Sequence, residues 1–442
     1  MAQKFIVAKK APVTTTSNSA KKQAIKDGTL NRTVAATPRM KLADLAEWVG
    51  GSVVGRKSLI DAVILGVVAR QNALFIGPPG TAKTFAVNKI ASAFAAEPGD
   101  VFSILLTKFT SPKEVFGPVS IKSLENDEVH YQTDGYMPSA KVVIVDEVFK
   151  GSSAILNAQL QIANERTFRN GKEVQQCPTR FMVGMSNEFP EDAAILAAYF
   201  DRYPIKLMVH SLEHDDFAAM LKVARDNGHA DECPVVLNDE DLAEIDSEVA
   251  AVEVPDDVIK AVCELRSGLD QKGVKVSDRR WAQSLKLIRA AAWLAGRDTA
   301  ARTDLKVLEL VCWNTVQEQG VIKGLIPDYL NPFQRQLRDT IDEVYAERAA
   351  VLTAANLDKK DAGRPSPDNM AAMKASAMAM ARIKAIEARI EVISEQLIES
   401  EEDKVIAEQA TASITSIKDA ISKLMQGKAG AELLAASEKK DV

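Results

Sequence analysis

A glycine- and proline-rich loop that ends in a lysine and a threonine carries the clearest chemistry in this sequence. The apolar residues of Leu74–Ile76 are typical of a buried strand, and the loop GPPGTAKT follows them directly. The backbone N–H groups of such a loop point inward at phosphate oxygens, while Lys83 supplies a mobile cation and Thr84 a hydroxyl for Mg²⁺. A helix that begins near Lys83 directs its positive end at the same anion. We therefore expect phosphate to contact Gly77, Pro78, Pro79, Gly80, Thr81, Ala82, Lys83 and Thr84.

One position departs from the P-loop pattern, because Ala82 stands where the pattern has glycine before the lysine. A methyl group is tolerated there if the residue keeps helical φ and ψ angles, so this departure weakens the P-loop signal only slightly. The alternative interpretation is a turn that joins a strand to a helix and binds nothing. The Lys-Thr pair and the preceding strand favour the phosphate site.

A second motif, VVIVDE at residues 142–147, is an apolar run that ends in two carboxylates. Such a run fits a parallel strand that is buried on both faces. Its carboxyl end would lie beside the P-loop, at the edge where ligands of open α/β sheets collect. We expect Asp146 to hold Mg²⁺ and Glu147 to polarise the water that attacks the terminal phosphate.

The composition sets limits on the class of protein. A chain of 442 residues has room for two or three domains, and 46% hydrophobic residues support real cores. No apolar run approaches the roughly 20 residues that span a bilayer. The four cysteines are widely spaced, which predicts reduced thiols in a cytoplasmic protein. The pair His210 and His214 lacks a glutamate in a zinc-protease pattern and is expected on a solvated helix.

The net charge of −6 is unevenly distributed. Residues 1–41 hold nine Lys or Arg and one acid, Asp27, so the remaining chain is strongly acidic. We expect the segment 1–41 to be a basic flexible arm. It could touch nucleic acid or an acidic partner, but packing on its own or a neighbouring subunit is the favoured interpretation. Nothing in the acidic body indicates a DNA-binding surface.

Hydrophobic patterns predict a core at residues 42–210 that alternates strands and helices. Further strands are expected at Phe102–Thr107, Phe181–Met185 and Tyr203–Val209, with a helix at Ser152–Asn164. The polar segment 109–136 is expected to end in a hairpin, with Ile121 on one arm and Val129–Tyr131 on the other. A second hairpin is predicted at Phe168–Val174, with Asn170-Gly171 as its two-residue turn.

The remaining chain reads as helical. Residues 211–329 show amphipathic spacing, and residues 330–442 form a third region that begins with a helix at Phe333–Leu352. Ile383, Ile386, Ile390, Ile393 and Leu397 then step as coiled-coil a and d positions do, as do Ile414, Ile417, Ile421 and Leu424. Three helices with two breaks predict a small bundle, and one long coiled coil is the alternative.

These blocks, in this order, resemble the MoxR group of AAA+ ATPases. GPPGTAKT, VVIVDE, GMSNEFP, FDRYP and VSDRRW carry the resemblance over roughly residues 42–325, and FTSPKEVFGPVSI is similar to the RavA-type branch. The resemblance implies an α/β fold, with a RecA-like αβα P-loop core at 42–210, an α-helical lid at 211–329 and a C-terminal helical bundle at 330–442. It implies a homo-oligomer, a hexameric ring with ATP between subunits, and a partner with a von Willebrand factor A domain. The chain departs from the RavA-type branch at 358–369, where a polar break replaces a small β insertion.

The same resemblance assigns roles to further residues. Val54 and Gly55 match the segment that cradles adenine, and Asn187 matches the sensor that orients the attacking water. Arg202 in FDRYP matches the arginine finger that reaches a neighbour's γ-phosphate, with Arg166 as a rival. The lid's sensor arginine matches Arg279, with Arg280 as the backup. The predicted catalytic set is thus Glu147, Asn187, Arg202 and Arg279.

The expected function is that of an ATP-hydrolysing machine, dependent on Mg²⁺, that remodels or matures protein complexes. A nucleic-acid motor or loader is the alternative from another class, and stimulation of ATPase activity by DNA or RNA would distinguish the two. A third hypothesis is a nucleotide-gated scaffold with little turnover, against which an intact Glu147 speaks. The sequence does not reveal the client.

Overall fold

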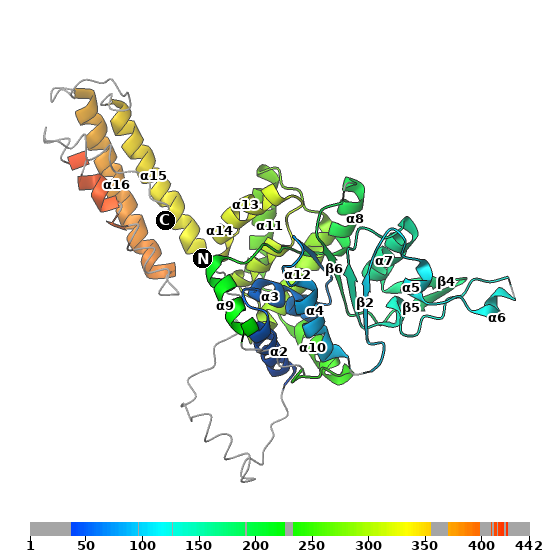
Figure 1. Ribbon diagram of the computed structural model, residues 1–442. Coiled ribbons are helices and arrows are strands. Elements are labelled where there is room, and N and C mark those ends of the chain that lie inside the picture. The colour runs from blue at the N-terminus through cyan, green and yellow to red at the C-terminus, as the bar shows by residue number, and fades with distance from the viewer. Residues whose placement is uncertain are drawn as a thin grey trace, which may run out of the picture. The chain divides into compact units, whose positions relative to one another are not determined.

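A computed structural model describes residues 37–95, 97–125, 127–190, 192–225, 233–354 and 370–397, together with 408, 411–412, 414–419 and 421–422. The chain forms two compact units, which divide between Lys323 and Gly324 (Figure 1). Residues 1–36 of the predicted basic arm and the predicted polar break at 358–369 lie outside the described residues. Among the described residues, no helix is long and apolar enough to cross a membrane.

A five-stranded parallel sheet forms the centre of the first unit. Its strands lie in the order β2-β3-β6-β1-β7. Their bounds are β1 at Ala73–Ile76, β2 at Val101–Leu105, β3 at Val142–Asp146, β6 at Phe181–Ser186 and β7 at Ile205–Met208. Every residue of β1 and β6 is buried, as expected of apolar strands that are covered on both faces. The predicted strands are therefore confirmed to within a residue or two at their ends.

Helices cover both faces of this sheet. The chain leaves β1 through α4 (Lys83–Ala91) to reach β2, and it returns across the sheet through α7 (Ser153–Glu165) and α8 (Ala193–Arg202). Because these crossovers run in opposite directions, right-handed connections place α4 on one face and α7 and α8 on the other. Helix α3 (Lys57–Ala69) packs beside α4, and α2 (Pro38–Ser52) packs against α3 (Figure 1). The predicted RecA-like αβα core is confirmed.

The segment between β2 and β3 differs from its prediction. Ile121 does not enter a hairpin arm, because Ile121–Leu124 forms one turn of helix, α6, after the short helix α5 (Pro112–Phe116). The antiparallel bridge joins Val119 to Tyr131 instead. Ser123 stabilises the turn by donating its hydroxyl to the Ser120 carbonyl at 2.8 Å. Local hydrogen bonds therefore win over strand pairing in this polar segment.

The second predicted hairpin is present with its turn shifted by one residue. Strand β4 (Thr167–Asn170) pairs with β5 (Glu173–Gln176) in antiparallel fashion, and Asn170 lies opposite Glu173. The turn residues are thus Gly171, with φ of 62°, and Lys172. Asn170 is buried and receives the Tyr131 N–H while donating its amide to the Tyr131 carbonyl. This side chain ties the hairpin to the preceding segment.

Helices occupy the remainder of the first unit. They are α9 (His214–Arg225), α10 (Asp239–Ala251), α11 (Asp256–Gln271), α12 (Asp278–Leu294), the 3₁₀ helix η3 (Arg302–Leu310) and α13 (Val316–Leu325). Side chains satisfy the first N–H groups of three of them: Asn238 caps α10, Ser277 caps α12 and Thr315 accepts from the Glu318 N–H of α13. Helix α12 packs against α3 and η3, which joins the helical part to the core.

The second unit is a helical bundle. Helix α14 (Pro327–Leu330) leads into α15 (Pro332–Ala354), which lies beside α16 (Met370–Leu397). A third helical segment within 408–422 completes one apolar cluster, whose isoleucines are Ile341, Ile383, Ile386, Ile390, Ile414, Ile417 and Ile421. The predicted heptad stripes are thus buried against each other, while the side chains of Leu397 and Leu424 lie outside the described residues.

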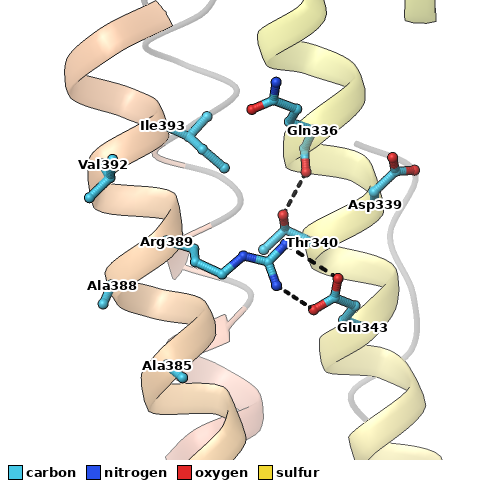
Figure 2. Close-up of a pocket in the computed structure, with 9 residues that line it drawn as sticks. All are labelled: Gln336, Asp339, Thr340, Glu343, Ala385, Ala388, Arg389, Val392 and Ile393. Carbon is cyan, nitrogen blue, oxygen red and sulfur yellow. Dashed lines mark hydrogen bonds and ion pairs between the residues drawn. The ribbon is translucent and has the colours of Figure 1, made fainter.

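A groove between α15 and α16 shows how the bundle is fastened at its surface. Arg389 of α16 donates to Glu343 of α15 at 2.8 Å, and Figure 2 shows this pair spanning the groove. Ile393 also lines this groove and is partly buried against the apolar cluster. An exposed ion pair of this kind contributes little free energy, so the buried isoleucines carry most of the stability.

Candidate functional site

The loop after β1 is shaped by close backbone contacts. Gly77 donates its N–H to the Ser186 carbonyl at 3.1 Å, and a Cβ atom at Gly77 would lie 2.0 Å from the Val209 carbonyl oxygen. Only glycine fits where three strand ends converge in this way. Gly80 has a φ of 76°, a backbone conformation that also favours glycine. Helix α4 begins at Lys83, as predicted, so its N–H groups face the loop.

Ala82 does not meet the condition under which a methyl group was expected to be tolerated in the loop. It does not have helical angles, because its φ of 61° and ψ of 22° place it in the left-handed region. That region costs a residue with a Cβ atom on the order of 1–2 kcal/mol relative to the right-handed one. Glycine, which the P-loop pattern has at this position, adopts these angles without that cost, so the backbone of this chain is strained at Ala82.

Lys83 is held inside the loop. Its side chain is buried, and its Nζ donates to the carbonyls of Gly77 at 2.6 Å and Pro78 at 3.0 Å. It also donates to Asn187 Oδ1 at 3.2 Å. Burial lowers the pKa of Lys83, and the nearby charge of Asp146 opposes that shift. The cation therefore lies where a P-loop lysine meets the outer phosphates, surrounded by oxygens that a phosphate could replace.

Thr84 and Asp146 form the predicted metal pair. Thr84 Oγ1 donates to Asp146 Oδ2 at 2.8 Å, which brings the start of α4 to the carboxyl end of β3. A hydroxyl and a carboxylate at that spacing are hard oxygen donors, and Mg²⁺ prefers such donors together with water and phosphate oxygens. The two residues thus fit a magnesium ion shared with a bound triphosphate.

The backbone conformation of Glu147 and two side-chain contacts fix the position of its carboxylate. Its backbone is left-handed, with a φ of 51°, immediately after β3. Asn187 donates its side-chain amide to Glu147 Oε1, and Lys150 Nζ lies 3.2 Å from Glu147 Oε2. Asn187 follows β6, so it links the carboxylate of Glu147 to Lys83 on the other side. The structure therefore brings Lys83, Thr84, Asp146, Glu147 and Asn187 together at one edge of the sheet.

Val54 and Gly55 lie at the same edge. Gly55 has a φ of 70°, and a Cβ atom there would lie 2.6 Å from Leu212 Cδ2, so its backbone touches the segment that follows β7. Arg56 reinforces this contact by donating to the His210 carbonyl at 2.7 Å. Since β7 pairs with β1, Val54 and Gly55 border the P-loop end of the sheet.

Arg202 lies at the opposite end of the sheet. It ends α8, and its carbonyl accepts a hydrogen bond from the side chain of Asn72, the residue before β1. Arg166 lies beside it, because its Nη2 donates to Asn72 Oδ1 at 3.0 Å. The four residues of β1 rise about 3.3 Å each, so roughly 10 Å of strand separates these arginines from the start of the P-loop. Neither candidate finger is near the P-loop of its own chain.

Arg279 and Arg280 have different surroundings. Arg280 is buried and donates its Nη2 to Asn314 Oδ1 at 2.6 Å, so the predicted backup is engaged in packing. Arg279 is exposed. It lies two residues after Ser277, whose hydroxyl donates to Asp201 Oδ1 at 2.9 Å. Arg279 is therefore placed at the Arg202 end of the sheet.

A basic cleft lies between Arg166 and Arg202 on one side and the helical part of the unit on the other. Arg166 and Arg202 line it from the core, and Gln283, Lys286 and Arg289 line it from α12. Its volume is about 470 Å³. Burial lowers the pKa of Arg166 to about 10, which leaves its guanidinium charged at neutral pH. The cleft can therefore receive an anion such as a phosphate group.

Sequence reasoning missed three residues of this arrangement: Asn72, Lys150 and Asp201. Asn72 precedes a strand in a Gln-Asn pair that carries no motif. Lys150 is three residues after Glu147, and that spacing could have been noticed. Asp201 lies inside the FDRYP block but received no role there, and the structure pairs it with Arg280 at 3.5 Å.

Two protein-family descriptions match the part of the chain that contains these residues. A family described as the MoxR domain of MoxR-vWA-beta-propeller ternary systems matches residues 40–246. A family described as an AAA lid domain matches residues 257–326. The two matches together span the P-loop, both carboxylates and every arginine considered above.

Individual relatives agree with these matches. An uncharacterised protein of Methanocaldococcus jannaschii is 31% identical over 301 residues, which are 68% of this chain and 77% of that protein. A Mycobacterium tuberculosis protein named chaperone MoxR1 is 26% identical over 132 residues, which are 30% of this chain and 33% of that protein. A crystal structure from Cytophaga hutchinsonii, described as a candidate ATPase, has a TM-score of 0.53 at 19% identity and covers 70% of this chain and 97% of its own. At that identity the likeness shows the fold alone.

Proposed function

The chain belongs to the MoxR family of AAA+ ATPases, and from that premise we propose that it hydrolyses ATP in order to remodel or mature protein complexes. ATP is bound with Mg²⁺ between neighbouring copies of the chain in a ring, which we take to be hexameric. The observation that carries this proposal is the division of the predicted site between two ends of one sheet. Lys83 and Glu147 lie at one end, and Arg202 lies at the other.

The residues at the P-loop end divide the work of hydrolysis. Lys83 leaves the loop carbonyls to neutralise the β- and γ-phosphates, while the N–H groups of the loop hold the other oxygens. Thr84 and Asp146 would hold the Mg²⁺, which when bound withdraws charge from the phosphates. Glu147 accepts the proton of the attacking water, and Asn187 orients both that water and the carboxylate. Val54 and Gly55 border the position of the adenine.

The residues at the other end serve the next copy. Arg202 places a cation on the neighbour's γ-phosphate and stabilises the charge that develops during transfer. Arg279 lies at the same end and acts on the same neighbour. Arg166 supports Arg202 through Asn72 and does not replace it, because its half-buried guanidinium already donates to the Asn72 amide oxygen. A complete site therefore requires two copies.

The family description also suggests the kind of partner. Its MoxR domains come from ternary systems of MoxR, von Willebrand factor A and β-propeller components, and we propose a partner of the von Willebrand factor A class. A protein client and a cytoplasmic setting fit the same proposal, as does the RavA-type resemblance. A nucleic-acid motor is disfavoured, because Lys172 at the hairpin turn is neutralised by Glu128 at 2.6 Å. DNA or RNA that stimulated turnover severalfold would reverse this preference.

The test is complementation between two inactive variants. Arg202→Ala is expected to bind ATP without hydrolysing it, and Lys83→Ala is expected to bind none. Mixed rings would contain interfaces that join an intact P-loop to an intact Arg202, so activity should return. Absence of any rescue in rings whose mixed composition has been verified by mass spectrometry would refute the division of the site between copies.

A further inference from the structure

Asp201, the residue before the proposed finger Arg202, contacts the lid. Asp201 Oδ1 accepts a hydrogen bond from the hydroxyl of Ser277 at 2.9 Å and lies 3.5 Å from Arg280 Nε. Ser277 caps α12 and Arg280 belongs to its first turn. Asp201 is 76 residues away from Ser277 in the sequence. The end of α8 is therefore attached to the start of a lid helix.

A second contact holds Phe200, the residue before Asp201, against the lid. The ring of Phe200 packs edge-on against Trp313, with centroids 5.4 Å apart and planes at 78°. Both side chains are buried. Trp313 lies in the segment after η3, so it too belongs to the helical part of the unit. Edge-to-face aromatic pairs prefer a defined geometry, which limits how Phe200 can move independently.

Two buried cations fix the segment that carries Trp313. Lys206 of β7 donates to the carbonyls of Val311 at 2.7 Å and of Trp313 at 2.5 Å. Arg280 donates to the same two carbonyls at 3.3 and 3.4 Å. Hydrogen bonds from a charged donor are stronger than those between neutral groups, so these contacts hold the segment after η3 in place. Burial lowers the pKa of both side chains, so the carbonyls and Asp201 have to compensate for lost hydration.

Three consecutive residues thus have distinct contacts. Phe200 and Asp201 contact the lid. Arg202 follows, and within the part of the chain that the structure describes its guanidinium donates to the Ala198 carbonyl of its own helix at 3.0 Å. We infer that Asp201 is a positioning residue: through Ser277 and Arg280 it makes the place of Arg202 depend on the place of the lid in the same copy. The inference rests on the proposed role of Arg202 toward a neighbour.

The functional consequence is a defined direction of communication around a ring. A lid that shifts when its own copy binds or releases nucleotide carries the end of α8 with it. Arg202 then approaches or leaves the neighbour's γ-phosphate, so one copy's nucleotide state controls hydrolysis in the next. A displacement of about 1 Å can change a rate by roughly 100-fold when a group must be aligned with a transition state.

The experiment replaces Asp201 without touching Arg202. Asp201→Asn removes the charge that faces Arg280 and keeps an oxygen for the Ser277 hydroxyl. Ser277→Ala removes that hydroxyl and serves as the second variant, and Lys41→Ala is the matched control, because it breaks a 2.7 Å ion pair with Asp241 elsewhere between α2 and α10. We expect both test variants to keep their KM for ATP and to lose about tenfold or more in kcat, whereas the control keeps both values.

Two further measurements separate positioning from general damage. Mixing Asp201→Asn with Lys83→Ala should restore activity, because the defect lies toward the neighbour. Adding Asp201→Asn to Arg202→Ala should slow turnover no further, since no arginine is left to misplace. Full activity of Asp201→Asn, or a defect that mixing does not rescue, would overturn the inference. Retained activity of Arg202→Ala alone would instead refute the proposed function on which it rests.

Discussion

Replacing Ala82 with glycine tests the strained backbone at the start of α4. Ala82 has left-handed angles, which cost a residue with a Cβ atom about 1–2 kcal/mol. Glycine removes that cost but gains about 0.4–1 kcal/mol of conformational freedom in the unfolded chain. Glycine is also the better residue at a helix N-cap, the position that Ala82 occupies. The net expectation for Ala82→Gly is a stabilisation of about 0.5–1 kcal/mol.

The matched control is the same substitution at a residue with ordinary helical geometry. Ala243 is exposed in the interior of α10. Ala243→Gly should destabilise the unit by about 1 kcal/mol, since glycine is a poor helix former. The two variants should therefore differ by about 1.5–2 kcal/mol, or roughly 2–3 °C in the midpoint of thermal unfolding for a unit of this size.

The assay is thermal unfolding without nucleotide, followed for both variants and the parent chain. Ala82→Gly should unfold at a higher temperature than the parent and Ala243→Gly at a lower one. Calorimetric titration with ATP should show unchanged or slightly tighter binding by Ala82→Gly, because glycine supports the same loop. If Ala82→Gly unfolds as early as Ala243→Gly, Ala82 does not have left-handed angles and the reasoning fails.

Three further variants follow from the site and the bundle. Lys83→Ala should abolish ATP binding in calorimetry, because the phosphates lose the loop's mobile cation, and an unchanged affinity would contradict the P-loop assignment. Glu147→Gln should bind ATP but hydrolyse it on the order of 10²–10⁴ times more slowly, and turnover at the parent rate would count against its role as base. Ile417→Asp buries a charge in the bundle core; trypsin should then cleave the C-terminal unit rapidly while ATP binding persists, and unchanged protease resistance would refute the packing.

Much of the core could be predicted from the sequence, because its signals are local. The strands that hold the P-loop and Asp146 are apolar runs bounded by turn residues, and parallel strands end at a common edge. The isoleucine stripes of the bundle follow a heptad spacing that survives in the structure at Ile383, Ile386 and Ile390. In each case the residues that form the pattern lie close together in the sequence.

The errors have physical causes of another kind. A single apolar residue such as Ile121 is equally compatible with one helical turn and with a strand, and hydrogen bonds to Ser120 decide the matter. The angles of Ala82 depend on how tightly the loop closes between two elements. Asp201 contacts Ser277 and Arg280, which are distant from it in the sequence, so no local spacing could have predicted these contacts.

The side chain of Asn72, at the Arg202 end of the sheet, makes four hydrogen bonds that few other residue types could make. Its amide nitrogen donates to the carbonyls of Ala163 and Arg202, and its oxygen accepts from Arg166 and from the N–H of Met182. Aspartate would offer two acceptors to two carbonyls, and leucine of similar size would leave all four groups unpaired in the interior. In a library that contains all twenty residues at this position, selection for activity should therefore return asparagine almost alone. Recovery of many residue types would show that the four hydrogen bonds are dispensable. If asparagine alone is recovered, mutational tolerance at this position, which lies outside every recognised motif, is as narrow as at the P-loop lysine.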